Sequence, residues 1–301
     1  MSSALTTTLL GVTMNNPVIA ASGTFGFGHE YAERFDISRL GGISGKGLTL
    51  HGSSGNDGMR VWETPAGLMN SIGLENPGVR RFIKEECPYM RAAGCAVLAN
   101  LGGHSEADYI AGAELLNEAD IDILELNISC PNVKAGGMAF GVLPKSTEAI
   151  VKKVKAVTKH PLLVKLSPNA ENIVAVAQAA EGAGADGVSL VNSFLGLAID
   201  VAGKKAVFEN VYAGLSGPAI MPIALRMVHQ VAHAVRIPVV GLGGIATVND
   251  ALSFFMAGAS AIQVGTITFA QPDAMLTIID GLERYCLEQG LLNIAEIIGI
   301  V

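Results

Sequence analysis

Short apolar runs rich in β-branched residues alternate along this chain with longer segments of helical character. Eight of the runs are expected to be strands, at residues 17–22, 42–48, 95–101, 121–128, 162–167, 187–193, 238–242 and 261–265. Helical patterns lie between them, near 30–37, 79–93, 106–118, 146–159, 171–182, 218–235 and 248–257, with a last one from Pro272. The strands are apolar almost without interruption, so both faces should be buried, as is typical of a parallel sheet.

Eight β/α units in 301 residues predict an α/β protein with a closed (β/α)8 TIM barrel, formed by a single domain over residues 1–301. The alternative is an open, doubly wound sheet. That fold usually carries a G-x-G-x-x-G fingerprint after its first strand, and the segment SGTFGFG at 22–28 does not have this spacing.

Two connections are too long for simple βα loops. Residues 49–78 contain the only tryptophan, Trp62, among many Gly, Pro and Asn residues, and residues 194–217 form the second connection. Both follow the carboxyl end of a predicted strand, which is the catalytic face of such a barrel. We therefore expect long βα-loop insertions at this face, where long loops are more often functional lids than disordered segments.

Polar residues gather where the predicted strands end, at Ser22, Lys46, Asn100, Asn127, Lys165, Asn192 and Ser193. Lysines near a barrel interior are costly unless they are paired. The alternative for one of them is a structural ion pair, for which Glu125 is a candidate partner. Two lysines and three asparagines on one rim predict a site for an anionic ligand that forms hydrogen bonds.

The segment NISCPN at 127–132 follows the fourth predicted strand and places Cys130 on a short turn. Glycines at 136, 137 and 141 come next, which is how a reactive group is presented on a loop at the mouth of a scaffold. The alternative is a buried cysteine that acts as a small hydrophobe, and the residues alone leave both interpretations open.

Glycine-rich turns follow the seventh and eighth predicted strands. Gly243 and Gly244 lie in the first turn, and Gly265 precedes Thr266 in the second. Backbone N–H groups at these two turns can hold a phosphate, which is the usual phosphate position in this fold. The competing interpretation is a pair of tight turns that need glycine for their geometry.

Composition narrows the classes of function. The chain is 50% hydrophobic and 16% charged, with a formal net charge of −7, which argues against a nucleic-acid surface. No apolar run reaches the roughly 18 residues that cross a bilayer, so no membrane association is expected. The four cysteines form no C-x-x-C pair and no secretory signal is evident, which favours a cytoplasmic protein with reduced thiols. The six histidines have no metal-ligand spacing, and no metal site is expected.

Several stretches together resemble one family over essentially the whole chain. They are ASGTFGFG at 21–28, GKG at 45–47, NSIGLENPG at 70–78, NISCPN at 127–132, VNS at 191–193, GG at 243–244 and GT at 265–266. This set resembles the class 1 dihydroorotate dehydrogenases, and most closely the class 1B catalytic subunit. Cysteine at position 130 separates the chain from class 2, which has serine there and an N-terminal membrane extension.

The resemblance implies oxidation of (S)-dihydroorotate to orotate in pyrimidine biosynthesis, with FMN as the cofactor and Cys130 as the general base. The residues implied for FMN are Ser22, Lys46, Gly47, Asn100, Asn127, Lys165, Val191, Gly217, Gly243, Gly244, Gly265 and Thr266. Those implied for the substrate are Lys46, Asn70, Ser71, Ile72, Gly73, Leu74, Asn127, Asn132, Asn192 and Ser193.

The same resemblance implies a partner. Class 1B catalytic subunits pair with an electron-transfer subunit that carries FAD and a 2Fe–2S cluster and passes electrons to NAD. The implied assembly is a homodimer of this chain within a heterotetramer. Two alternatives remain at this stage: a related flavin-dependent dihydropyrimidine dehydrogenase acting on uracil or thymine, and a non-catalytic subunit that binds a phosphate-containing ligand.

Overall fold

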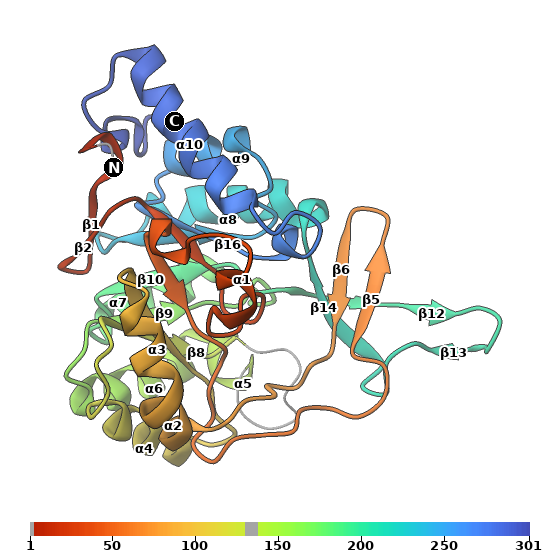
Figure 1. Cartoon of the computed structure of the whole chain (residues 1–301). Helices are drawn as coiled ribbons and strands as arrows, with labels where there is room; N and C mark the ends of the chain where they lie inside the picture. Colours follow the sequence, from red (N-terminus) through yellow and green to blue (C-terminus); the bar gives the residue numbers. More distant parts are fainter. Residues whose placement is uncertain (1–2, 130–137) are drawn as a thin grey trace.

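Eight parallel strands close a barrel in chain order (Figure 1). The computed structural model describes residues 3–129 and 138–301. The barrel strands are β3 (Val18–Ala20), β4 (Gly42–Ser44), β7 (Ala96–Leu101), β8 (Ile123–Asn127), β9 (Leu162–Lys165), β10 (Gly187–Leu190), β15 (Val239–Leu242) and β16 (Ala261–Val264). Pairing of β16 with β3 completes the ring. The TIM barrel is therefore confirmed, the open sheet is wrong, and every barrel strand lies within its expected range.

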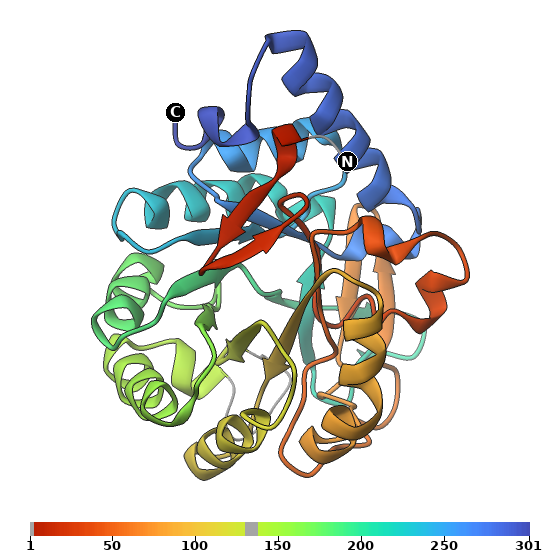
Figure 2. The same ribbon diagram turned by 60° about the vertical axis from the view of Figure 1, so that its left-hand side comes forward.

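Helices surround the barrel (Figure 2). They are α1 (His29–Ala32), α2 (Val79–Arg81), α3 (Cys87–Ala92), α4 (Glu106–Leu116), α5 (Met138–Gly141), α6 (Pro144–Val157), α7 (Ile173–Gly182), α8 (Met221–Ala232), α9 (Val248–Met256) and α10 (Ala274–Gln289). In α6 the buried residues Thr147, Ile150, Val151 and Val154 follow the helical period, so one face packs on the barrel. A π-helical turn, Phe82–Glu86, joins α2 to α3, and the helix expected at 30–37 is the single turn α1.

The amino-terminal end of the barrel is closed by a small hairpin, β1 (Thr7–Leu9) and β2 (Val12–Met14). Figure 2 shows it in red across that end of the barrel. Leu9 and Met14 pack against inward-facing residues of the barrel strands, among them Ile19, Leu98 and Leu163. The hairpin was not expected from the sequence. Its apolar contacts fill one end of the barrel interior, so the space for a ligand lies at the other end.

The two long connections fold together into one antiparallel sheet. Its order is β11 (Phe194–Leu197), β14 (Tyr212–Ser216), β6 (Gly67–Asn70) and β5 (Val61–Thr64), and a two-stranded ribbon, β12 (Ile199–Asp200) and β13 (Lys205–Ala206), extends from it (Figure 1). The insertions lie where the sequence places them, but the strands within them were not expected. This sheet forms a wall beside the carboxyl ends of the barrel strands.

The remaining short elements are 3-10 turns, at Ser3–Leu5, Ile37–Arg39, Pro218–Ile220, Thr266–Phe269 and Ile294–Ile297. Across residues 3–129 and 138–301, none of the helices is at once long and apolar enough to cross a membrane.

Candidate active site

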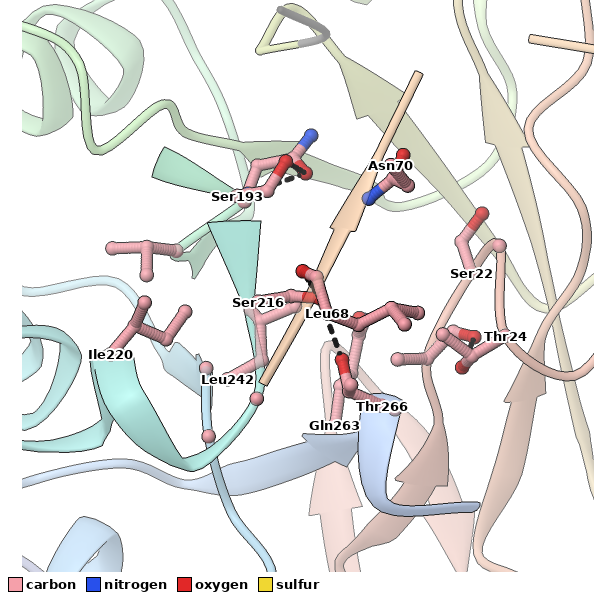
Figure 3. A pocket seen from close by; sticks show the side chains of 18 of the residues that line it. Ser22, Thr24, Leu68, Asn70, Ser193, Ser216, Ile220, Leu242, Gln263 and Thr266 are labelled. Atoms are coloured by element: carbon pink, nitrogen blue, oxygen red, sulfur yellow. Dashed lines mark hydrogen bonds between the residues drawn. The ribbon is translucent and has the colours of Figure 1, made fainter. Parts of the chain in front are cut away.

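A cavity of about 1290 Å³, counted out to its open mouth, lies at the carboxyl ends of the barrel strands (Figure 3). Most of the residues selected from the sequence line it: Ser22, Lys46, Gly47, Asn70, Ile72, Gly73, Leu74, Asn127, Lys165, Val191, Asn192, Ser193, Gly217, Gly243, Gly244, Gly265 and Thr266. They come from the barrel, from both insertions and from the two glycine turns. The fold therefore gathers in one place residues that are up to about 240 positions apart in the sequence.

Two of the selected residues that the structure describes do not line the cavity. Asn100 is fully buried behind it, where its amide nitrogen donates to Glu125 at 2.7 Å. Ser71 is also buried, and its hydroxyl accepts hydrogen bonds from Asn56 and Asn210. Cys130 and Asn132 lie outside the described residues. Asn100 and Ser71 thus act on the cavity through the residues they hold.

A buried polar layer forms the cavity floor, with the carboxylate of Glu125 at its centre. Each Glu125 oxygen accepts two hydrogen bonds: Oε2 from Ser44 at 2.6 Å and Asn100 at 2.7 Å, and Oε1 from Ser189 at 2.9 Å and Gln263 at 2.7 Å. Burial by itself would raise the pKa of Glu125. The charge of Lys165 and the hydrogen bonds from Ser44, Asn100 and Gln263 outweigh that effect and hold the pKa below its ordinary value.

The expected pairing of a lysine with Glu125 takes an indirect form. Lys165 is 4% exposed, and its ammonium donates to Gln263 Oε1 at 3.4 Å, while Gln263 Nε2 donates to Glu125. Gln263 therefore stands between the two charges. Lys165 also lines the cavity.

Gln263, Ser44, Ser189 and Ser216 were missed by the sequence analysis. The first three carry a readable signal, because each is a polar residue inside an otherwise apolar barrel strand. Ser216 has no such signal. It ends β14, and its hydroxyl accepts a hydrogen bond from Thr266 at 2.9 Å, which ties the antiparallel sheet to the turn after β16 (Figure 3).

A row of amides continues from the floor along the cavity wall. Asn127 Nδ2 donates to Asn100 Oδ1 at 3.2 Å, and Asn127 Oδ1 accepts from the Ser129 hydroxyl at 2.9 Å. Asn192 Nδ2 donates to the same Ser129 hydroxyl at 2.8 Å. The Tyr109 hydroxyl donates to the Asn127 carbonyl at 2.8 Å. These contacts fix two cavity amides and the residue that precedes Cys130.

The segment 70–78 is held against the cavity by Asn76, which is buried. Its side-chain oxygen accepts from the backbone N–H groups of Thr49 and Gly78, at 3.0 and 2.9 Å, and its Nδ2 donates to the Leu74 carbonyl at 2.6 Å. Leu74 has a left-handed backbone, with φ of 56°, which brings its side chain to the cavity. Asn76 thereby maintains a loop shape that the backbone alone disfavours.

The cysteines in the described part of the chain are remote from this chemistry. Cys87, Cys95 and Cys286 are buried and unpaired, and burial raises the pKa of each thiol, that of Cys95 to about 11. We expect iodoacetamide to leave these three unmodified in folded protein at neutral pH, because the thiolate is the reactive form. Peptide mass mapping checks this, with urea-unfolded protein as the control that labels all three. Rapid labelling of any of them in folded protein would contradict it.

No cluster of metal-binding side chains occurs among residues 3–129 and 138–301.

Comparison with known proteins identifies the family. The family model for dihydroorotate dehydrogenase matches residues 4–286. Three relatives carry the name dihydroorotate dehydrogenase B (NAD(+)), catalytic subunit. The protein from Petrotoga mobilis is 52% identical over 97% of this chain and 98% of its own length. Those from Bacteroides thetaiotaomicron and Geotalea uraniireducens are 50% and 47% identical, over 95% and 98% of this chain and 95% and 97% of their own lengths. The chain belongs to the dihydroorotate dehydrogenase family.

Proposed function

We propose that this chain oxidises (S)-dihydroorotate to orotate as the FMN-binding catalytic subunit of an NAD-linked dihydroorotate dehydrogenase in pyrimidine biosynthesis. One observation carries the proposal beyond family membership. A single cavity holds a cation, a row of fixed amides and two glycine turns, which together suit a flavin phosphate and a carboxylate-bearing pyrimidine.

The glycine turns fit a phosphate-bearing cofactor. Gly243 and Gly244 have φ of 122° and 81°, so the turn after β15 has a shape that side chains disfavour. A Cβ on Gly244 would lie 2.8 Å from the Gly217 carbonyl and 2.7 Å from the Met221 Cβ. Bare backbone at this point leaves the N–H groups accessible to phosphate oxygens, between the ends of β15 and β16. We assign the phosphate to Gly243, Gly244, Gly265 and Thr266.

Replacing Gly244 with alanine is expected to weaken FMN binding about 100-fold. A left-handed alanine costs about 1–2 kcal/mol, and relief of the close contacts moves the turn that holds the phosphate. The dissociation constant of FMN, measured by quenching of its fluorescence, checks the prediction. Gly182→Ala is the matched control, because Gly182 ends α7 and a Cβ there would meet open space. This variant should bind FMN with the affinity of the parent. Parental affinity in Gly244→Ala would remove this turn from the phosphate site.

Bound FMN supplies the hydride acceptor for C6 of dihydroorotate. Lys165 lies beside the flavin in this proposal, and its ammonium stabilises negative charge on the reduced ring. Ser22, Gly47, Asn100, Val191 and Gly217 support the ring and the ribityl chain, directly or through neighbours.

The substrate lies against the amide row and the segment from the first insertion. Asn127 and Asn192 offer N–H donors to the carbonyl and carboxylate oxygens of the substrate, and an asparagine can also accept from its ring N–H groups. Lys46 binds the carboxylate. Asn70, Ser71, Ile72, Gly73, Leu74, Asn132 and Ser193 complete this side. The hydrogen bonds of Asn127 and Asn192 orient these two amides before substrate arrives, so little ordering is left for the binding step.

Cys130 removes the proton from C5 while hydride leaves C6, so that a carbon–carbon double bond forms and the substrate loses two electrons. A thiol is a usable base near neutral pH. Ser129, the residue before it, is fully buried and bonded to Asn127 and Asn192. That anchoring supports the assignment, because the base must be held at a fixed distance from the substrate that the same asparagines bind.

The electrons pass to a partner subunit in this proposal. The names of the relatives describe a catalytic subunit of an NAD(+) enzyme, which implies an electron-transfer subunit. We propose that this partner carries FAD and a 2Fe–2S cluster, and that two copies of each chain form a cytoplasmic heterotetramer.

Anaerobic addition of dihydroorotate to the purified chain, loaded with FMN, tests the proposal. Loss of the yellow flavin band on this chain alone is the expected result. A flavin that dithionite reduces but dihydroorotate does not would overturn the substrate assignment. Reduction by dihydrouracil that orotate does not inhibit would favour a dihydropyrimidine substrate, and failure to bind any flavin would favour a non-catalytic subunit.

A further inference from the structure

The carboxylate of Glu125 lies at the start of a chain of hydrogen bonds that reaches the substrate side of the cavity. It is 0% exposed and does not line the cavity. It accepts hydrogen bonds from four different barrel strands, β4, β7, β10 and β16. A buried charge with such a complete set of donors has a cost in desolvation, which a purely structural core does not require.

The direction of each hydrogen bond in the chain follows from the carboxylate, because a charged carboxylate only accepts. Asn100 must turn its amide nitrogen toward Glu125, so its oxygen faces Asn127. Asn127 must then donate to Asn100, and its own oxygen accepts from the Ser129 backbone and hydroxyl, at 3.2 and 2.9 Å. The orientation of the Asn127 amide is therefore set jointly by Glu125, acting through Asn100, and by the Ser129 backbone N–H.

The chain continues through Ser129 to Asn192, whose nitrogen donates to the serine hydroxyl and whose oxygen accepts from Ser193 N–H at 2.8 Å. Within the described residues, Asn127 and Asn192 each use one of their two amide hydrogens in these bonds. The second hydrogen of each remains for a ligand. The cavity consequently presents donors, which suit carbonyl and carboxylate oxygens, at both positions.

Glu125 also balances a charge. Lys165 is the ionisable group whose charge acts on Glu125, and Gln263 bridges the two. The other groups that face the carboxylate, from β4, β7, β10 and β16, are hydroxyls and amides that stay neutral near physiological pH.

We infer that Glu125 is a positioning residue for this site. It helps to set the donor direction of the amides that meet the substrate, and through Gln263 its negative charge offsets the positive charge of Lys165. The inference rests on the proposed function. It adds that Glu125, a residue outside the cavity, influences which ligand groups the cavity binds and the midpoint potential of the flavin.

The variant Glu125→Gln tests the inference on the FMN-loaded protein. Glutamine keeps the shape but places an N–H₂ group opposite the amide of either Asn100 or Gln263, so one of these two amides must turn. We expect orotate, titrated by its effect on the flavin spectrum, to bind about tenfold more weakly, equivalent to the loss of about one hydrogen bond. The flavin midpoint potential should rise above that of the parent, because the negative charge that offsets Lys165 is removed.

Ser189→Ala is the matched control, because it removes one neutral donor from the same carboxylate and keeps the charge. It should retain the parental flavin midpoint potential and bind orotate within about twofold. Parental orotate affinity in Glu125→Gln, or a parental flavin midpoint potential, overturns the inference. If Glu125→Gln does not fold, the double variant Glu125→Gln/Lys165→Met tests whether the two charges balance each other. A folded double variant supports charge balance, and an unfolded one overturns it.

Failure of the proposed function has a different signature. If the proposed function is wrong, dihydroorotate does not reduce the flavin of the parent protein. If only this inference is wrong, the flavin of the parent is reduced, and Glu125→Gln has the orotate affinity and flavin potential of the parent.

Discussion

Replacing Cys130 with serine is expected to slow reduction of the bound flavin by dihydroorotate about 10²–10⁴-fold, the usual contribution of a positioned general base. A serine hydroxyl is far less acidic than a thiol, so almost none of it is present as the base at neutral pH. Affinity for orotate should change little, because the substrate is held by the lysine and the amides of the cavity. Stopped-flow measurement of flavin absorbance under anaerobic conditions gives both quantities.

The control for this substitution is Cys286→Ser, which makes the same chemical change at a buried position on α10, away from the cavity. Dihydroorotate should reduce the flavin of this variant at the parental rate, even if the substitution lowers the stability of the fold. A parental rate in Cys130→Ser would remove the cysteine from the base role. A large loss of orotate affinity instead would mean that position 130 binds substrate rather than moves a proton.

The barrel and most of the cavity wall could be predicted from the sequence for a simple physical reason. Strands buried on both faces are apolar throughout, so eight such runs separated by helical patterns leave few folds. The carboxyl ends of parallel strands meet at one face, so polar residues at those ends, such as Lys165 and Asn192, had to converge. No knowledge of side-chain contacts was needed for that step.

The antiparallel sheet could not be predicted, because its strands come from two insertions that are far apart in the sequence and meet only in the folded chain. β6 pairs with β14, which places Asn70 opposite Gly214 and Leu68 opposite Ser216. Each strand is short, and it is stabilised by the small apolar cluster beneath it, which includes Met69 and Phe208. Tertiary contacts of this kind decide strand formation where local preference is weak.

The buried polar layer was only partly predictable. Glu125 was expected as a direct partner for a lysine, since a charge in an apolar strand needs compensation. The sequence did not show that Gln263 stands between them, because that arrangement depends on which strands are neighbours across the closed ring. β16 meets β3 only through closure of the barrel, and a side chain from the last strand thereby reaches residues of the middle strands.

Replacing Lys165 with methionine is expected to lower the free energy of unfolding by about 3–5 kcal/mol at pH 7, the typical effect of removing one partner from a buried charge pair. The variant keeps the length of the side chain but leaves the Glu125 carboxylate without its counter-charge. Urea unfolding of flavin-free protein measures the change without a contribution from ligand binding. Lys153→Met is the matched control, because Lys153 forms an exposed ion pair with Glu106 and should cost less than about 1 kcal/mol.

The pH dependence of this loss separates a charge effect from a packing effect. In the parent, the pKa of Glu125 is lowered, so the carboxylate stabilises the fold above the unfolded value of 4.5, and this contribution disappears as the pH falls through the folded pKa. In Lys165→Met, burial prevails and the folded pKa rises above 4.5. The charged carboxylate then destabilises the fold at neutral pH, and protonation relieves that cost as the pH falls. The stability difference between parent and variant should therefore shrink from pH 7 to pH 5. A difference that stays constant over this range would mean that the loss comes from packing, and that Lys165 does not hold the charge of Glu125.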